Sequence, residues 1–150
     1  FNKTYTLIYE MIQNLEDGQL NTDTIKPKQL HEIQKKIKGA IHMKLFDANY
    51  KLLEEMYDDE YFPDFLVDKV KMELQKVIAL LESGETRTEM IQEKLDEAVC
   101  AINDLQEEFD ENDSEIETVA RDSIGETVAY ILEWFDIPID IEEAIRERDW

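Results

Sequence analysis

The sequence has 150 residues, of which 43% are hydrophobic, and its formal net charge at neutral pH is −21. This length fits one domain with a real core, and the hydrophobic content excludes a disordered chain. Only three Pro and four Gly occur, which argues against a loop-rich or all-β fold. No apolar run approaches the roughly 18 residues that a membrane span needs.

The acidic charge is concentrated in the last two thirds of the chain. Residues 1–56 carry eight Lys and eight Asp or Glu, whereas residues 57–150 carry eight Lys or Arg and 29 Asp or Glu. Such a field repels nucleic acid and anionic lipid, so we expect no nucleic acid and no membrane as partners, and it attracts basic proteins. A simpler alternative is that the acidity only keeps the protein soluble.

Apolar residues recur three and four apart along most of the chain, which predicts amphipathic helices. A first helix is predicted over residues 4–17, before Gly18, and a second begins near Pro27 and carries Lys on its outer face. Five more helices are predicted over residues 47–57, 64–83, 88–109, 114–135 and 140–148. We therefore expect an all-α, single-domain bundle of six or seven helices, with residues 1–55 as a neutral, Lys-bearing extension and residues 56–150 as an acidic core.

Two pairs of polar residues predict where the last two helices begin. Ser114 with Glu117 and Asp140 with Glu143 have the spacing of capping boxes, in which each side chain satisfies a free backbone N–H of the other residue. Gly125 lies inside the first of these helices. A glycine there is expected to mark the close approach of a neighbouring helix.

Cys100 is the single cysteine, which excludes an internal disulfide. It stands beside Val99 in an apolar helical pattern, so we expect an inert, packed thiol. The lack of a recognisable secretory segment and of paired cysteines favours a reducing, cytoplasmic location. Trp150 is expected to dock on the bundle, because a free Trp would leave a large apolar area in water.

Three aromatic residues, Tyr57, Tyr61 and Phe62, surround the acidic triplet Asp58–Glu60. Pro63 follows and favours an extended residue and then a helix start. Aromatic residues in such a corner usually pack into the core. A ligand pocket near Tyr57, Tyr61 and Phe62 is the alternative.

Asp110, Asn112 and Ser114 have the spacing of the first ligands of a calcium-binding EF-hand loop. The loop then requires Gly at its sixth position and a bidentate Glu at its twelfth, but the sequence has Glu115 and Arg121. The pattern fails at its two most demanding positions, so we expect no calcium site.

The remaining motif chemistries lack their residues. His31 and His42 are the two histidines, and neither has a Glu three residues before it, as a di-iron bundle requires. Zinc would lack ligands, and no glycine-rich phosphate loop or nucleophile elbow occurs. Acid pairs are too numerous to single out a catalytic dyad. We therefore expect no metal and no cofactor, and we favour a non-enzymatic role.

Several segments of residues 56–150 resemble a small bacterial family of unknown function. The resemblance rests on Met56-Tyr57, Tyr61-Phe62-Pro63, Leu66-Val67-Asp68-Lys69, Asn103 to Phe109, Ser114-Glu-Ile-Glu-Thr-Val-Ala-Arg121 and Arg148-Asp149-Trp150. It covers about two thirds of the chain and implies an α-helical bacterial domain. It implies no activity.

The densest acidic stretch points to a partner-binding surface. No Lys or Arg occurs between Lys94 and Arg121. We expect a non-enzymatic binding protein, such as an inhibitor, immunity-like or adaptor protein, that presents carboxylates to a basic protein. The expected contact residues are Glu107, Glu108, Asp110, Glu111, Asp113 and Glu115, extended by Asp58, Asp59 and Glu60. The alternatives are a small enzyme or ligand binder at the aromatic corner, and a homodimer built through the first two helices.

Overall fold

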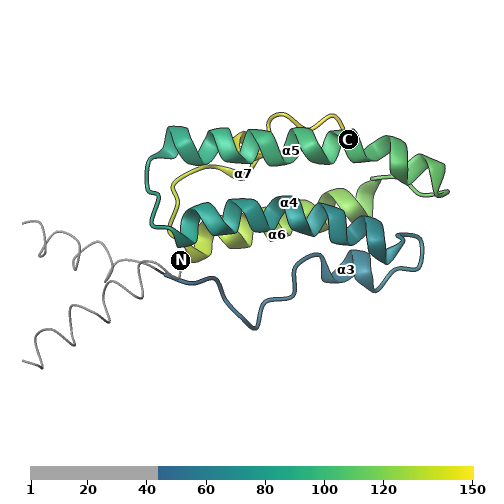
Figure 1. Ribbon diagram of the computed structural model, residues 1–150, viewed down its shortest axis with the longest axis horizontal. Helices are drawn as coiled ribbons and strands as arrows, with labels where there is room; N and C mark the ends of the chain where they lie inside the picture. Colours follow the sequence, from purple (N-terminus) through teal and green to yellow (C-terminus); the bar gives the residue numbers. More distant parts are fainter. Residues whose placement is uncertain (1–43) are drawn as a thin grey trace, which may run out of the picture. The chain divides into compact units, whose positions relative to one another are not determined.

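The expected helices after residue 46 are all present in a computed structural model, which describes residues 44–150 (Figure 1). The described residues contain no strand and form α3 (Glu54–Tyr57), α4 (Asp64–Glu82), α5 (Thr88–Glu111), α6 (Thr118–Trp134) and α7 (Ile141–Ala144). The two helices expected before residue 44 lie outside the described residues. Residues 45–150 form one compact unit, and the all-α class is confirmed for the described part of the chain.

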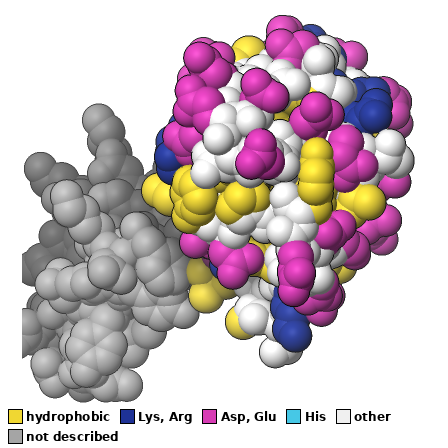
Figure 2. All heavy atoms as spheres, turned by 90° about the vertical axis from the view of Figure 1, so that its right-hand side faces the viewer, with side chains coloured by type: hydrophobic (Ala, Val, Ile, Leu, Met, Phe, Trp, Pro, Cys, Tyr) yellow, Lys and Arg dark blue, Asp and Glu magenta, His cyan; other side chains and the backbone are white. Residues whose placement is uncertain are grey.

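Helices α4 and α5 form an antiparallel hairpin, the largest helix pair of the unit. Seven apolar residues on one face of α4 are buried: Leu66, Val67, Val70, Leu74, Val77, Ile78 and Leu81. Gly84 ends the helix as expected, because its φ of 92° is in the left-handed region that favours glycine. The hairpin brings the start of α4 beside the end of α5. Both lie at the right-hand end of Figure 1, which faces the viewer in Figure 2.

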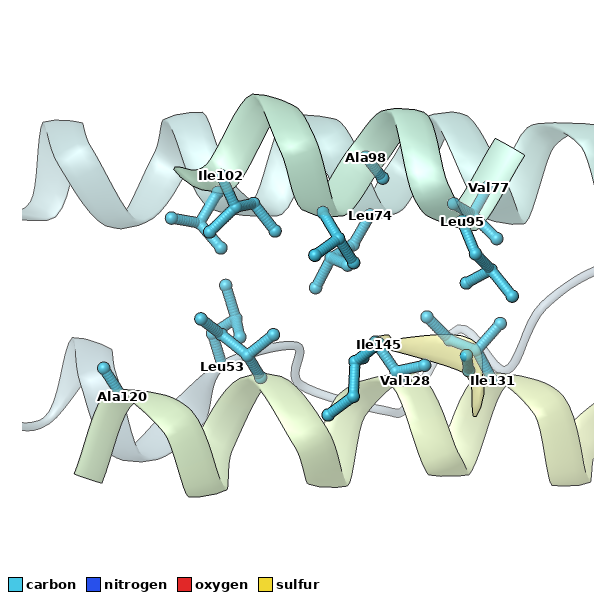
Figure 3. Close-up of a cluster of buried hydrophobic side chains, with 14 of the residues drawn as sticks. Leu53, Leu74, Val77, Leu95, Ala98, Ile102, Ala120, Val128, Ile131 and Ile145 are labelled. Atoms are coloured by element: carbon cyan, nitrogen blue, oxygen red, sulfur yellow. The ribbon is translucent and has the colours of Figure 1, made fainter. Parts of the chain in front are cut away.

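The second layer consists of α6, α7 and the residues around α3. Figure 3 shows buried side chains of α4 and α5 facing those of α6, together with Leu53 and Ile145. The backbone N–H of Leu53 donates to Thr127 Oγ1 (3.4 Å), and Ser123 Oγ donates to Glu55 (3.0 Å). The core therefore lies between two helical layers, and α3 is fixed to α6 by polar contacts as well as by packing.

The predicted start of α6 is wrong by four residues. Residues 114–117 are not helical, α6 begins at Thr118, and no side chain caps it. Ser114 is buried with its hydroxyl unpartnered, while its backbone N–H donates to Phe109 O (2.9 Å). The capping box of Ser114 and Glu117 is thus absent, because these residues continue the turn that closes α5.

The predicted helix over residues 47–57 is shortened to α3, because aromatic contacts hold the earlier residues in another conformation. The rings of Tyr50 and Tyr130 stack with centroids 3.9 Å apart, and Tyr130 Oη donates to Asp47 (2.6 Å). Trp134 Nε1 donates to Leu45 O (2.9 Å). These contacts attach residues 45–50 to α6 instead of letting them extend α3.

Helix α7 is also shorter than predicted. Asp140 caps it by accepting a hydrogen bond from the backbone N–H of Glu142, which confirms the predicted cap, but Glu143 pairs with Arg146 instead of completing a capping box. Trp150 is partly buried and packs against the core, as predicted.

Three other residues correct the sequence interpretation. A Cβ at Gly125 would meet nothing within 4 Å, so no helix approaches closely there. Cys100 is exposed rather than packed, and Val119, which has the apolar helical spacing of its neighbours, is 39% exposed.

Candidate functional site

The hairpin of α4 and α5 brings the two predicted acidic segments to one end of the unit. Lys69 in the second turn of α4 pairs with Glu108 near the end of α5, with Nζ 2.6 Å from the carboxylate. Tyr61, just before α4, lies close enough to Glu115 and Glu117 for their charges to act on it. Residues 58–60 and 107–115, distant in sequence, therefore contribute to the surface at the same end of the unit (Figure 1).

We call this surface the acidic end. It comprises the nine carboxylates predicted from the sequence: Asp58, Asp59, Glu60, Glu107, Glu108, Asp110, Glu111, Asp113 and Glu115. All nine are exposed or partly exposed. Figure 2 looks onto this end, where magenta Asp and Glu side chains greatly outnumber the blue Lys and Arg. The surface has the charge and accessibility that contact with a cationic partner requires.

Ion pairing neutralises little of the acidic end. Within residues 44–150, Glu108 is its one member in a salt bridge, with Lys69. Asp59 instead accepts a hydrogen bond from the backbone N–H of Tyr61 (2.9 Å). No cation is near residues 107–113 in the sequence, but the fold brings Lys69 beside Glu108. The antiparallel pairing of α4 with α5 is the feature from which the position of Lys69 beside Glu108 could have been predicted.

Exposed apolar residues lie near the carboxylates of the acidic end. They were not among the contact residues predicted from the sequence. Tyr61 is 43% exposed, Phe65 is 50% exposed and Met72 is 57% exposed. The ammonium of Lys69 lies 6.0 Å from the centre of the Phe65 ring, so one cation contacts both the apolar and the acidic groups. Yellow side chains are visible among the magenta ones in Figure 2.

The three aromatics of the corner have different environments. Phe62 is only 2% exposed and belongs to the core, while Tyr61 faces solvent. Tyr57 is half-buried and donates a hydrogen bond to Asp68. Burial, followed by that hydrogen bond and the carboxylate charge, raises the pKa of Tyr57, so its hydroxyl remains a donor at neutral pH. Two of the three aromatics therefore contribute to packing, since Phe62 lies in the core and Tyr57 packs against it.

Comparison with known protein families identifies most of the described chain. A family of unknown function (DUF5713) matches residues 46–150. The chain belongs to the DUF5713 family. The match begins ten residues before Met56, where the quoted resemblance starts, and it includes the whole acidic end. No curated protein and no solved structure matches the chain.

Two hollows occur within the DUF5713 region, on either side of α7. One of about 650 Å³ lies between α5 and residues 138–146, and one of about 490 Å³ lies between α6 and residues 141–150. Neither is lined by Tyr57, Tyr61 or Phe62, so these hollows do not support a ligand pocket at the aromatic corner.

Polar contacts attach the C-terminal segment to α5. Arg146 pairs with Asp96 (2.7 Å), and Asn103 Nδ2 donates to Glu147 O (2.8 Å). Gln92 donates to Glu143 O (3.0 Å), which leaves its own carbonyl oxygen buried and unpartnered. These contacts fasten residues 143–149 to the hairpin.

Among residues 44–150, no group of three His, Cys, Asp or Glu residues could hold a metal ion, and no helix is long and apolar enough to cross a membrane. Desolvation, with the charges of Glu147 and Asp96, raises the pKa of the Cys100 thiol. A raised pKa disfavours the reactive thiolate.

Proposed function

We propose that the protein is a non-enzymatic binding protein whose acidic end contacts a basic protein partner, in the manner of an inhibitor, immunity-like or adaptor protein. The observation that carries the proposal is the gathering of nine accessible carboxylates from two distant segments, with Lys69 the cation paired to them among residues 44–150. An arrangement that only kept the protein soluble would not require the two segments to meet.

The physical role of such a surface is to guide association. Carboxylates on one end generate a potential that accelerates encounter with a cationic surface and orients the collision. Exposed charges add little affinity by themselves because water and salt screen them. The proposal therefore predicts a large dependence of the association rate on salt and on the charges of the acidic end.

The decisive experiment compares two variants of equal net charge. In the first, Asp110→Asn, Glu111→Gln and Asp113→Asn neutralise the acidic end. In the second, Glu89→Gln, Glu93→Gln and Glu133→Gln neutralise three exposed carboxylates outside it. The partner is captured from the source cell at low salt with the full chain, and its association rate is measured with each variant by stopped-flow fluorescence.

We expect the first variant to slow association at least about tenfold at an ionic strength of roughly 0.05 M, and the second to slow it less than about twofold. Equal slowing by both variants would mean that only the overall charge matters, and the proposal would then be rejected. Failure to capture any basic protein would also count against it.

A further inference from the structure

Phe65 and Met72 are exposed apolar residues on the outer side of α4, and the exposed Tyr61 lies three residues before its start; we call these three residues the apolar stripe. Phe65 and Met72 are seven residues apart, which places them on one face of the helix after about two turns. That face is opposite the buried stripe of Leu66, Val70 and Leu74. The inner face of α4 therefore supplies the apolar side chains that pack in the core. Core packing does not explain why Phe65 and Met72 occur on the outer face.

Single exposed apolar residues are normal on protein surfaces. Here, however, three of the six large hydrophobic residues that are exposed in the described part of the chain lie within twelve positions of one another. Aromatic and Met side chains are also the types most enriched where proteins bind partners. This concentration is what a contact surface requires.

The charges around the Phe65 end of the stripe favour a cationic occupant. Asp64 and Asp68 flank Phe65 on α4 and are both exposed, and Glu108 adjoins it through Lys69. The nearby cations are already engaged by the protein itself. Lys69 lies between Glu108 and the Phe65 ring, and Lys71 lies over the ring of Tyr57, 5.9 Å from its centre.

We infer that the stripe of Tyr61, Phe65 and Met72 binds a cationic amphipathic helix of the basic partner. Apolar residues of that helix, spaced four and seven apart, pack against the stripe, and Lys or Arg on its flanks meet the carboxylates of the acidic end. This inference rests on the proposed function and specifies it, since the carboxylates supply steering and the apolar stripe supplies the desolvated contact that slows dissociation.

A second copy of the chain is a poorer occupant of the same surface. A symmetric dimer places the same patch of each chain against the other. It would bring the carboxylates of two acidic ends together in a protein of net charge −21. Like charges that face each other across an interface cost several kcal/mol, so charge complementarity favours a basic partner over self-association.

The test uses two synthetic peptides of about 18 residues with the same number of Lys. In the amphipathic peptide, Leu occupies every inward position of a helix, and in the polar peptide Gln replaces each Leu. Binding to the full chain is measured by fluorescence anisotropy at about 0.05 M and about 0.2 M NaCl. We expect the amphipathic peptide to bind at least about tenfold more tightly than the polar one.

Variants then locate the contact. The double substitution Phe65→Gln with Met72→Gln is expected to weaken the amphipathic peptide at least about tenfold and the polar peptide less than about twofold. Met90→Gln is the matched control, because Met90 is 39% exposed at the start of α5, outside the stripe. Gln is a good helix former, so circular dichroism melts are expected to show all variants folded.

The outcomes separate the two proposals. If the double variant binds like the Met90→Gln control while neutralisation of Asp110, Glu111 and Asp113 abolishes binding, the stripe is not the contact and the acidic end remains the site. If neither set of substitutions changes binding, both proposals fail. If light scattering shows a dimer that the double variant dissociates, the occupant is a second copy and the assignment to a basic helix is overturned.

Discussion

Phe62 and Tyr61 are neighbours in the chain but lie in opposite environments, 2% and 43% exposed. We expect Phe62→Ala to lower the free energy of unfolding by about 3–5 kcal/mol, because it removes a fully buried ring and leaves a cavity. Tyr61→Ala is expected to change it by less than about 1 kcal/mol, since Tyr61 lies at the surface and its removal leaves no enclosed cavity. Urea denaturation of both variants measures the difference. Similar losses would show that Tyr61 is a core residue after all.

Asp96 makes the polar contacts between α5 and the C-terminal segment dependent on pH. Burial raises the pKa of this carboxyl, but hydrogen bonds from Arg146 and Gln92 outweigh it, so its pKa lies below the usual value. A carboxyl with a depressed native pKa stabilises the fold above its unfolded pKa of about 3.9. That contribution is lost as the pH falls through the native pKa.

We therefore expect Asp96→Asn to cost about 1 kcal/mol at neutral pH, a value that allows for solvent screening of Arg146. The cost is expected to shrink as the pH falls below about 3.9 and to disappear once the pH is below the native pKa, where the native carboxyl is also protonated. Asp104→Asn, on an exposed position of the same helix, is the control. Urea titrations from about pH 7 to about pH 3 measure both. A cost that stays constant with pH would contradict the ion-pair account.

Single residues were the least predictable part of this chain. Ser114 has the sequence signature of a helix cap, yet it is buried in the turn after α5. Cys100 follows an apolar pair but points away from the core. A sequence motif indicates which hydrogen bonds a side chain can form and whether it can be buried. The packing of the neighbouring elements determines which of these arrangements occurs.

At the scale of elements, Gly125 offers a direct test of helix energetics. It lies inside α6, and an added Cβ meets nothing within 4 Å. Gly in a helix interior lowers stability by roughly 0.5–1 kcal/mol relative to Ala, because Gly gives the unfolded chain more conformational entropy, which is lost on folding. We expect Gly125→Ala to raise the free energy of unfolding by that amount, as measured by urea denaturation.

The reverse change at Ala129, in the same helix, provides the comparison. Ala129→Gly is expected to lower stability by about the same amount or more, because Ala129 is partly buried. Destabilisation by Gly125→Ala would revive the expectation from the sequence that a helix approaches closely at this position.

The length of each helix governed how well it could be predicted. Helices α4 and α5 agree with expectation to within two residues at each end, because five or more turns of regular apolar spacing leave little ambiguity. Helices α3 and α7 were predicted much too long. Helices of one turn are marginal alone, so their limits depend on tertiary contacts such as the stacking of Tyr50 on Tyr130.

At the scale of the molecule, the carboxylates of the candidate site could be predicted, but Phe65 and Met72 could not. The nine carboxylates stand out as runs of like charge, and pairing of the two long helices brings the runs together. Phe65 and Met72 were not recognised, because an apolar residue on a helix is first assigned to its core face. Only the observed burial of Leu66, Val70 and Leu74 identifies the outer face as a second apolar stripe.

The net charge of −21 has a consequence for the stability of the whole fold. Within a compact structure the excess carboxylates repel one another more strongly than in the expanded unfolded chain. Added salt screens this repulsion, because the Debye length falls from about 30 Å at 0.01 M to about 8 Å at 0.15 M. The ion pairs seen at the surface are also screened, but exposed pairs contribute little. Repulsion is therefore the larger effect.

We expect the melting temperature at neutral pH to rise by roughly 3–8 °C between these two NaCl concentrations, which corresponds to about 1 kcal/mol for a domain of this size. Differential scanning calorimetry measures it. The control is the same comparison near the isoelectric point of about 4.3, where the net charge is close to zero and the rise should nearly vanish. A melting temperature that falls with salt at neutral pH would mean that attractive pairs such as Lys69 with Glu108 outweigh the repulsion among the carboxylates.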